Sequence, residues 1–238
     1  SPQRLVCEVC ACISKRYSFI RLTLSRFVVS IILRSQCFRN YFLNFGEFMK
    51  NYSLIIWDFN GTLLDDVGAA LGSVNDMLAR RSKKPITLDE YREYIDVPIR
   101  HFYEQVLDLE NEDYDLILTE FQRGYEAHVK NCGLTCYVSA ALEEAKRLGI
   151  PQVVLSSSEQ SQLERLLKHY EIDGYFDSVL GADNLLAGSK VERAEKFIEE
   201  HGVDASKAVV VGDLLHDCDV AKAIGSQCLL ITSGPPHP

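Results

Sequence analysis

The chain reads LIIWDFNGTL over residues 54–63, and this stretch decides the fold. Its four leading apolar residues are typical of a short buried strand, and Gly61 lets the backbone turn where the strand ends. Asp58 is therefore expected at the carboxyl end of a strand, where open α/β sheets bind their ligands. A carboxylate there can attack phosphorus when a metal ion and fixed donors neutralise charge on the transferred group. Taken alone, the pattern also fits an ordinary turn at a strand end.

Three later segments bring further functional groups to the ends of predicted elements. Two of them, residues 152–156 and 208–212, are apolar runs typical of buried strands, and each ends in polar residues. The third segment opens a helical pattern with a lysine. In chain order the groups are a nucleophile, hydroxyls, a cation and two acids: Asp58; Ser156 and Ser157; Lys190; Asp213 and Asp217.

This set of motifs resembles the haloacid dehalogenase-like hydrolases, in particular their phosphoglycolate phosphatase-like branch. The resemblance covers about residues 50–233, and its first and last motifs are the specific ones. It implies a Mg²⁺-dependent phosphatase that acts on a small phosphorylated metabolite through an aspartyl-phosphate. Mg²⁺ suits such a site because it prefers carboxylate, carbonyl and water oxygens. The implied catalytic residues are Asp58, Asn60, Ser156 and Lys190, and the implied metal ligands are Asp58, the backbone carbonyl of Asn60, Asp213 and Asp217.

Each implied role has a physical reason. Ser156 would donate to a phosphoryl oxygen, and Lys190 would offset the charge of the transition state. The hydroxyls of Thr62 and Ser157 are the expected substrate-binding groups in the same motifs. Ser156 also fits a strand-end hydroxyl that satisfies the backbone, and Lys190 also fits a solvated lysine. Many relatives follow this lysine with Pro-x-Pro, whereas residues 191–193 are Val-Glu-Arg here.

Asn60 departs from the family pattern, because phosphatases of this family usually place a second Asp two residues after the nucleophile. That Asp protonates the leaving alkoxide and then activates the hydrolytic water. Asn cannot exchange a proton at neutral pH, and losing a general acid–base lowers a rate by roughly 10²–10⁴-fold. Three explanations stay open: another acid substitutes, the leaving group needs little protonation, or the protein is not an efficient phosphatase.

Asn60 also leaves two other functions open. Phosphonate-cleaving relatives lack the second Asp but need a Schiff-base lysine in the cap, for which Lys83 and Lys84 are the candidates. The chain also fits a metal-binding regulatory protein whose catalysis has decayed, although the intact acidic motifs oppose that interpretation. Relatives that act on haloacids usually have Tyr at this position and would not need the metal ligands, so we disfavour a dehalogenase.

Residues 96–101 form a turn between two predicted cap helices, where the family's caps present a specificity loop. Arg100 would bind a substrate carboxylate or phosphate through two parallel hydrogen bonds, and His101 would supply a proton near pH 7. An Arg-His pair on a helix surface is also commonly only solvated. The four basic side chains in residues 80–84 are interpreted as an exposed helix end.

Hydrophobic periodicity predicts an α/β fold, a doubly wound parallel sheet with an inserted all-helical cap. Helical patterns run from residue 65 to 129, and Thr87 with Glu90 forms a capping box at the start of the second one. From residue 139 helices alternate with strands, which implies right-handed crossovers and helices on both faces of the sheet. The expected strands are 54–57, 152–156, 178–181, 208–212 and 227–231. The expected domains are a core at 49–67 and 136–238 and a cap at 68–135.

Residues 1–48 differ from the rest of the chain. They carry seven Lys and Arg against two acidic residues, and they hold four of the eight Cys. We favour a non-native or non-functional extension that is disordered or non-native, with Met49 as the functional start. A targeting segment and a local binding role, with Cys7 and Cys10 at metal-ligand spacing, stay open.

Composition sets the expected surroundings of the protein. A chain of 238 residues can bury a sizeable core, and no apolar run approaches the ~20 residues that cross a bilayer. The net charge of −9 disfavours nucleic acid, because phosphate backbones require clustered Lys and Arg. The cysteines after residue 48 show no disulfide framework, which favours a reducing cytoplasm. We expect no nucleic-acid or membrane partner, and neither the metabolite nor the oligomeric state follows from the sequence.

Overall fold

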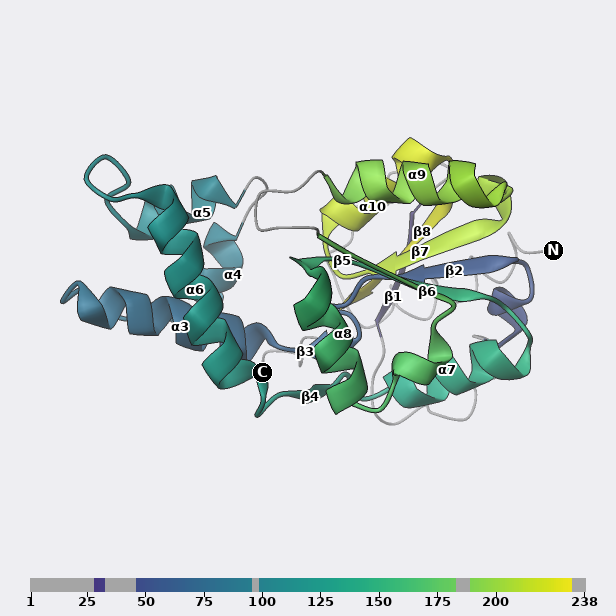
Figure 1. Ribbon diagram of the computed structural model, residues 1–238, viewed down its shortest axis with the longest axis horizontal. Helices are drawn as coiled ribbons and strands as arrows, with labels where there is room; N and C mark the ends of the chain where they lie inside the picture. Colours follow the sequence, from purple (N-terminus) through teal and green to yellow (C-terminus); the bar gives the residue numbers. More distant parts are fainter. Residues whose placement is uncertain (1–27, 33–45, 96–98, 183–188, 233–238) are drawn as a thin grey trace, which may run out of the picture.

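The computed structural model describes residues 28–32, 46–95, 99–182 and 189–232. The chain forms a core built on a β-sheet and a separate helical cap (Figure 1). Within these residues, no helix combines the length and the apolar character needed to cross a membrane.

The core sheet has six strands within the described residues, and all of them run parallel. Their order is β1-β8-β7-β2-β5-β6, so the nucleophile strand β2 lies inside the sheet. After β2 the chain adds strands on one side and then returns to add the others on the opposite side, which makes β2 the switch point where such sheets bind ligands. The strands are β1 (Val28–Ile32), β2 (Leu54–Trp57), β5 (Gln152–Glu159), β6 (Ser178–Ala182), β7 (Ala208–Gly212) and β8 (Gln227–Thr232).

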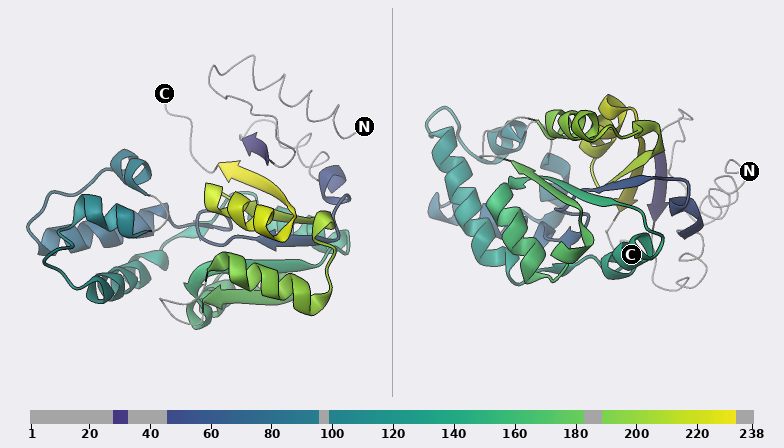
Figure 2. Two further views of the ribbon diagram at one scale, coloured as in Figure 1. Left: turned by 90° about the horizontal axis from the view of Figure 1, so that it is seen from above. Right: turned by 45° about the vertical axis from the view of Figure 1, so that its right-hand side comes forward.

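Helices cover both faces of the sheet, as the alternation of helices and strands predicted. Helices α7 (Val138–Arg147) and α8 (Gln160–His169) lie on one face, and α9 (Lys190–His201) and α10 (Leu215–Ile224) lie on the other (Figures 1 and 2). Successive side chains of a strand point to opposite faces. Along β2 they accordingly alternate between the two apolar cores, and the predicted doubly wound α/β fold is confirmed.

Within the described residues, the cap contains the four helices α3 (Val67–Arg80), α4 (Leu88–Tyr94), α5 (Arg100–Val106) and α6 (Tyr114–Val129). Thr87 and Glu90 form the predicted capping box, since each side chain accepts a hydrogen bond from the backbone N–H of the other residue. Helices α3 and α6 approach closely because Gly124 leaves room for the buried Ser73, whose hydroxyl donates to the Phe121 carbonyl.

Two short strands connect the cap to the core. Strand β3 (Leu64–Asp65) enters the cap and β4 (Gly133–Leu134) leaves it, and the two pair antiparallel. The N–H of Thr135 donates to the Leu63 carbonyl at 3.0 Å, which extends this contact. The region 68–135 was predicted to be all helical, and β4 departs from that prediction because two residues are too few to show a strand period.

In the part of the N-terminal region that the structure describes, one strand joins the sheet. Val28–Ile32 pairs in parallel with β8 at the sheet edge, although we expected no packed element before residue 49. Met49 itself is fully buried in the core. Residues 1–27 and 33–45, with Cys7 and Cys10, lie outside the described residues, so the assignment of residues 1–48 as an extension stays a prediction.

Candidate active site

A buried cluster of charges lies at the carboxyl end of β2. Asp58 follows the last residue of this strand, and its N–H donates to the Val211 carbonyl of β7 at 2.8 Å, so the pairing of two strands fixes its position. The Nζ atom of Lys190 lies 2.5 Å from Asp58 Oδ1 and 2.6 Å from Asp217 Oδ1. Three residues that are far apart in the sequence therefore meet in one ion-pair cluster.

Lys190 is 5% exposed, and lysine is rarely buried unless it is paired. Burial by itself would lower the pKa of this lysine, but the carboxylates of Asp58 and Asp217 outweigh burial and raise the pKa. Lys190 is therefore a permanent cation in the cluster. It is the first residue of α9, and a capping box between Ser189 and Glu192 holds that helix start in place.

The segment after Lys190, which departs from the family's Pro-x-Pro, has structural roles of its own. Glu192 completes the capping box of α9. The guanidinium of Arg193 donates from Nη2 to the Ser156 carbonyl at 2.8 Å, which ties the start of α9 to the end of β5. Lys190 is thus held by its helix and by the neighbouring strand, without the proline-rich segment.

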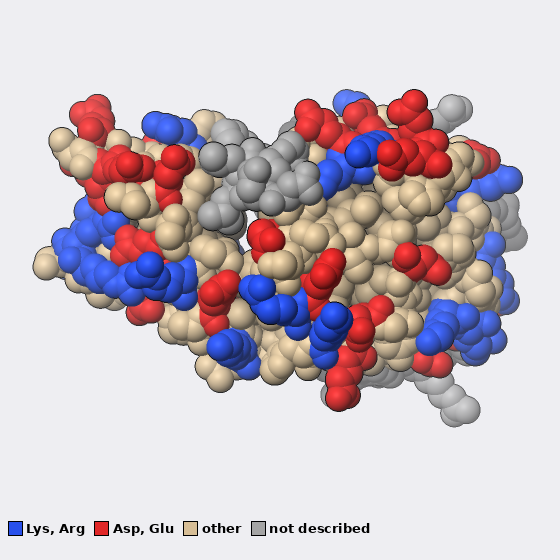
Figure 3. All heavy atoms as spheres, viewed as in Figure 1, with Lys and Arg blue, Asp and Glu red and all other residues tan. Residues whose placement is uncertain are grey.

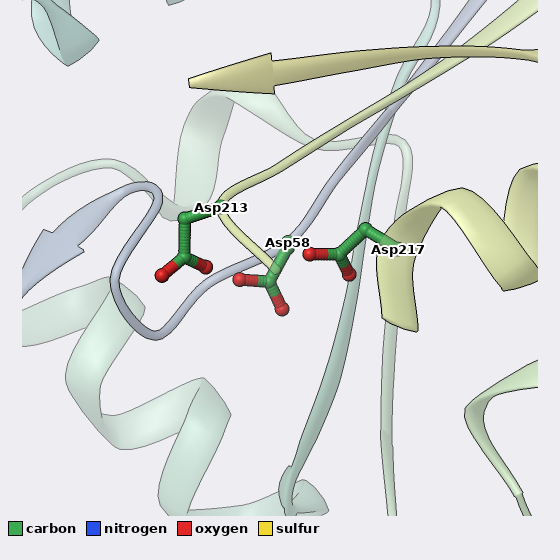
Figure 4. Close-up of side chains that lie close together, drawn as sticks. All are labelled: Asp58, Asp213 and Asp217. Carbon is green, nitrogen blue, oxygen red and sulfur yellow. The ribbon is translucent and has the colours of Figure 1, made fainter. Parts of the chain in front are cut away.

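Asp58, Asp213 and Asp217 converge on one point at the strand ends (Figure 4). Each offers a carboxylate oxygen, and these oxygens all lie within 4.8 Å of one another. Burial and the charge of Asp217 raise the pKa of Asp58 to about 6 against the opposing effect of Lys190. Burial and the charges of both neighbouring acids raise the pKa of Asp213 to about 8. Both pKa values are raised because, among the described residues, three carboxyl groups face one ammonium, and this shortage of positive charge is what an oxygen-binding divalent cation fits.

Two glycines make room for these acids. Gly61 has a φ of +77°, and a β-carbon there would overlap the carboxylate of Asp213. A β-carbon at Gly212 would overlap the carboxylate of Asp217. The glycines in the DFNG and VGD stretches are therefore required by the close approach of the acids as well as by the turn.

Asn60 lies at the centre of a second polar network, and each side of its amide has different partners. Its Nδ2 donates to Asp66 Oδ2 at 2.7 Å and to the Tyr125 hydroxyl at 2.8 Å. Its Oδ1 accepts hydrogen bonds from the hydroxyls of Ser156 at 3.1 Å and Ser158 at 2.8 Å. The amide is therefore held in one orientation, with its nitrogen toward the cap and its oxygen toward β5.

Asp66 anchors this network from the start of α3. Its Oδ1 accepts from the Gly61 N–H at 2.8 Å, and its Oδ2 accepts from the Tyr125 hydroxyl at 2.5 Å in addition to Asn60. Asp66 is 5% exposed, and burial raises its pKa while these hydrogen bonds act in the opposite direction. Burial and the Asp66 carboxylate raise the pKa of Tyr125, so its phenol keeps the proton that it donates.

The four residues expected to bind substrate are placed differently. Thr62 is buried, and its hydroxyl donates to Asp213 Oδ1 at 3.2 Å, which puts it in the acidic cluster. Ser157 is exposed beside that cluster's strand end. Arg100 pairs with Glu104 at 3.1 Å and lies 5.1 Å from the centre of the Tyr114 ring, so its described contacts are within the cap. His101 is exposed in the first turn of α5, and residues 96–98 before it lie outside the described residues.

The basic residues at the end of α3 form ion pairs within the cap. Arg80 pairs with Glu120, and Arg81 pairs with both Glu112 and Glu120. Lys83 donates to the Val106 carbonyl at 2.9 Å. Figure 3 shows Lys and Arg side chains gathered on this outer part of the cap. The interpretation of residues 80–84 as a helix end on the surface agrees with these contacts.

Comparison with known proteins identifies the family. A family model described as haloacid dehalogenase-like hydrolase matches residues 55–231. The chain belongs to the haloacid dehalogenase-like hydrolases. A curated relative, the phosphoglycolate phosphatase of Rhodobacter capsulatus, is 26% identical over 186 residues, which cover 76% of this chain and 84% of the relative.

Solved structures show the same fold. A haloacid dehalogenase-like family protein from Streptococcus pneumoniae superposes with a TM-score of 0.69 at 20% identity, covering 77% of this chain and 86% of that one. CbbY from Rhodobacter sphaeroides, solved in complex with xylulose-(1,5)bisphosphate, superposes with a TM-score of 0.59 at 20% identity, covering 78% and 87%.

Sequence reasoning missed three residues of this haloacid dehalogenase-like hydrolase: Asp66, Tyr125 and Ser158. The doublet Asp65-Asp66 offered a local signal, because one of two adjacent acids in a short strand-to-helix connection must face inward. The third serine of the run after β5 offered another. Tyr125 is 59 residues from Asp66 in the sequence, and no local pattern connects the two.

Proposed function

We propose that this hydrolase is a Mg²⁺-dependent phosphatase that cleaves a small phosphorylated metabolite through an aspartyl-phosphate on Asp58. The observation that carries the proposal is the buried Asp58 carboxylate, bonded to Lys190 beside Asp213 and Asp217 at the ligand-binding edge of the sheet. Relatives named phosphoglycolate phosphatase support a small phosphate monoester as substrate. A reducing cytoplasm remains the expected compartment.

The donor set fits Mg²⁺. The carboxylates of Asp58 and Asp213 and the backbone carbonyl of Asn60 would hold the ion, with Asp217 beside them. These donors are all oxygens, as Mg²⁺ prefers, and the raised pKa values of Asp58 and Asp213 mark a site that is short of positive charge. When bound, the ion supplies charge that offsets the phosphoryl oxygens and lets the carboxylate approach them.

The residues of the chain supply the remaining chemistry. An oxygen of Asp58 attacks phosphorus, the bond to the leaving oxygen breaks, and an aspartyl-phosphate forms, while the leaving oxygen takes a proton from solvent. Water then attacks this phosphorus and gives a proton to solvent, the bond between phosphorus and the Asp58 oxygen breaks, and phosphate and the Asp58 carboxylate are released. Lys190 holds Oδ1 of Asp58, which orients the carboxylate, and its ammonium offsets charge on the transferring group. The Ser156 hydroxyl is the donor for a phosphoryl oxygen once substrate replaces its contact with Asn60.

The network around Asn60 favours a second candidate, a metal-binding protein with low phosphatase activity. Its amide nitrogen donates to Asp66 and Tyr125, and an amide carries no exchangeable acid proton for a leaving alkoxide. Substrates whose leaving groups depart as stable anions would suffer least. A phosphonate-cleaving reaction has no such support, because Lys83 donates to the Val106 carbonyl within the cap and Lys84 is exposed.

A substrate panel tests the proposal. Phosphoglycolate, sugar phosphates and an aryl phosphate are assayed with Mg²⁺ and with a chelator, for wild type and for Asp58→Asn. We expect Mg²⁺-dependent release of phosphate and a loss of more than about tenfold in the variant, because only a carboxylate forms the acyl-phosphate. Asp219→Asn, an exposed acid on the same helix as Asp217, is the matched control and should keep full activity. Activity in Asp58→Asn above about a tenth of wild type, with an unchanged fold, would contradict the mechanism.

A further inference from the structure

We propose that Asp66 and Tyr125 are positioning residues that tie the cap to the catalytic loop and fix the direction in which Asn60 presents its amide. This inference rests on the proposed phosphatase function, which gives Asn60 its place beside the reacting group. The three residues belong to three different parts of the molecule. Asn60 lies in the loop after β2, Asp66 lies between β3 and α3, and Tyr125 lies on α6 of the cap.

The carboxylate at position 66 is the feature that holds the network together. It accepts three hydrogen bonds, one on Oδ1 from the backbone of Gly61 and two on Oδ2 from Asn60 and Tyr125. A carboxyl group has acceptor lone pairs on both of its oxygens, so it can serve donors on either side. An amide at this position would have to turn its NH₂ group toward at least one of the three donors, whichever way it faced.

The orientation of Asn60 follows from this arrangement. The Asp66 carboxylate requires a donor from residue 60, so Nδ2 faces the cap and Oδ1 faces Ser156 and Ser158. The Tyr125 hydroxyl accepts from the same Nδ2 and donates to the same carboxylate. Movement of α6 away from the loop after β2 would break the contact between Tyr125 and Asn60, and the amide would then lose one of the partners that hold its orientation. Closure of the cap and the orientation of Asn60 are therefore linked.

The variant Tyr125→Phe removes the hydroxyl and leaves the ring, which stacks on Phe121 with centroids 6.0 Å apart. We expect kcat to fall about tenfold or more while KM stays within about twofold, because misplacement of a group beside the reaction affects the transition state more than binding. Tyr175→Phe is the matched control. It also breaks a bond from a phenol to a carboxylate, at 3.0 Å from Glu143 on the surface of the core, and kcat should stay within about twofold of wild type.

Hydrogen exchange measures the same coupling without any substrate. In Tyr125→Phe the backbone amides of β3 (Leu64–Asp65) and β4 (Gly133–Leu134), which connect cap and core, should exchange several-fold faster than in wild type. They should not do so in Tyr175→Phe. Asp66→Asn should repeat both effects of Tyr125→Phe, whereas Asp65→Asn, its exposed neighbour, should show neither.

The two readouts separate the inference from the proposed function. Faster exchange in Tyr125→Phe in a protein that hydrolyses no phosphate ester would support the cap coupling and overturn the phosphatase. Wild-type exchange and wild-type kcat in a folded Tyr125→Phe would overturn the coupling and leave the phosphatase standing. A kcat of Tyr125→Phe that is no lower than the kcat of Tyr175→Phe, or an increase in KM alone, would also overturn the positioning role.

Discussion

The substitution Asn60→Asp restores the acid of the family pattern, but the structure places it against a second carboxylate. The atom that it replaces, Nδ2, lies 2.7 Å from Asp66 Oδ2. Two unit charges at that separation repel each other by about 6 kcal/mol at an effective dielectric constant of about 20. This exceeds the free energy that separates pH 7 from the ordinary pKa of an aspartate. One of the two carboxyls must therefore keep its proton at neutral pH.

That retained proton sets the size and the sign of the effect on stability. Keeping a carboxyl protonated at pH 7, against an unfolded-state pKa of about 3.9, costs up to about 4 kcal/mol of unfolding free energy. The pKa is raised in the folded state, so the folded protein binds the extra proton. The loss of stability is therefore absent near pH 4 and grows as the pH rises toward the raised pKa. We expect Asn60→Asp to match wild type near pH 4 and to be about 3–4 kcal/mol less stable at pH 7.

The double variant Asn60→Asp/Asp66→Asn removes the repulsion. The amide at position 66 would donate to the carboxylate at position 60 and accept from the Gly61 N–H, and the hydroxyls of Ser156 and Ser158 would still find an acceptor. We expect its stability to lie within about 1 kcal/mol of wild type. Its turnover of alkyl phosphates should rise on the order of 10²-fold, because a general acid–base is restored, and its turnover of aryl phosphates should rise less.

Urea unfolding at three pH values and kcat on paired alkyl and aryl substrates check this reasoning. The single variant should gain less activity than the double variant, because its proton is engaged with Asp66. A single variant as stable as wild type at pH 7 would show that the two side chains are not in contact. A double variant that gains no activity over the single variant on alkyl phosphates would show that Asn60 is not what limits turnover.

Three further predictions use the same geometry. Mg²⁺ affinity should rise between about pH 6 and pH 8, because binding must displace protons from Asp58 and Asp213. An affinity measured by calorimetry that stayed constant over this pH range would contradict the prediction. Lys190→Met should cost about 3–5 kcal/mol of stability at pH 7 by leaving Asp58 and Asp217 unpaired, and less at pH 4, which thermal unfolding tests. Deletion of residues 1–48 should lower the Tm by about 2–6 °C through loss of β1 but leave kcat within about twofold; a tenfold loss would mean that the segment serves the site.

The sheet was predictable because its central strands are continuous apolar runs. Each strand that lies between two others must be apolar on both faces, and β7 and β2 satisfy this over their whole length. The end of β5 was placed too early, at residue 156, because the serines that continue it to Glu159 give no apolar signal. Strand β4 was missed because two residues show no period, and its partner β3 is equally short.

The acidic cluster was also predictable, for a topological reason. Asp58 and Asp213 each follow a strand, Lys190 opens a helix, and parallel strand ends share one edge of a sheet, so chain order sufficed to bring them together. The Asn60 network depends on a different kind of contact. Tyr125 reaches Asp66 only because α6 packs along α3 in the cap, and the direction in which a helix presents one side chain depends on that packing.

The amide at position 60 and the carboxylate at position 66 have to be interpreted as a pair. A carboxylate at 60 beside an amide at 66 would satisfy the same neighbours, so the two arrangements differ mainly in where the negative charge lies. In this chain the negative charge lies on the buried Asp66, which accepts hydrogen bonds from the Asn60 amide and from the Tyr125 hydroxyl. The side chains of Asp58, Asp213 and Asp217 are the same in both arrangements. The arrangement in this chain, however, has no proton donor for the leaving group at position 60. Compared with a carboxylate at 60 beside an amide at 66, the arrangement in this chain should therefore lower turnover while leaving metal binding intact. A measured Mg²⁺ affinity that is equal in wild type and in Asn60→Asp/Asp66→Asn would support this separation of binding from rate.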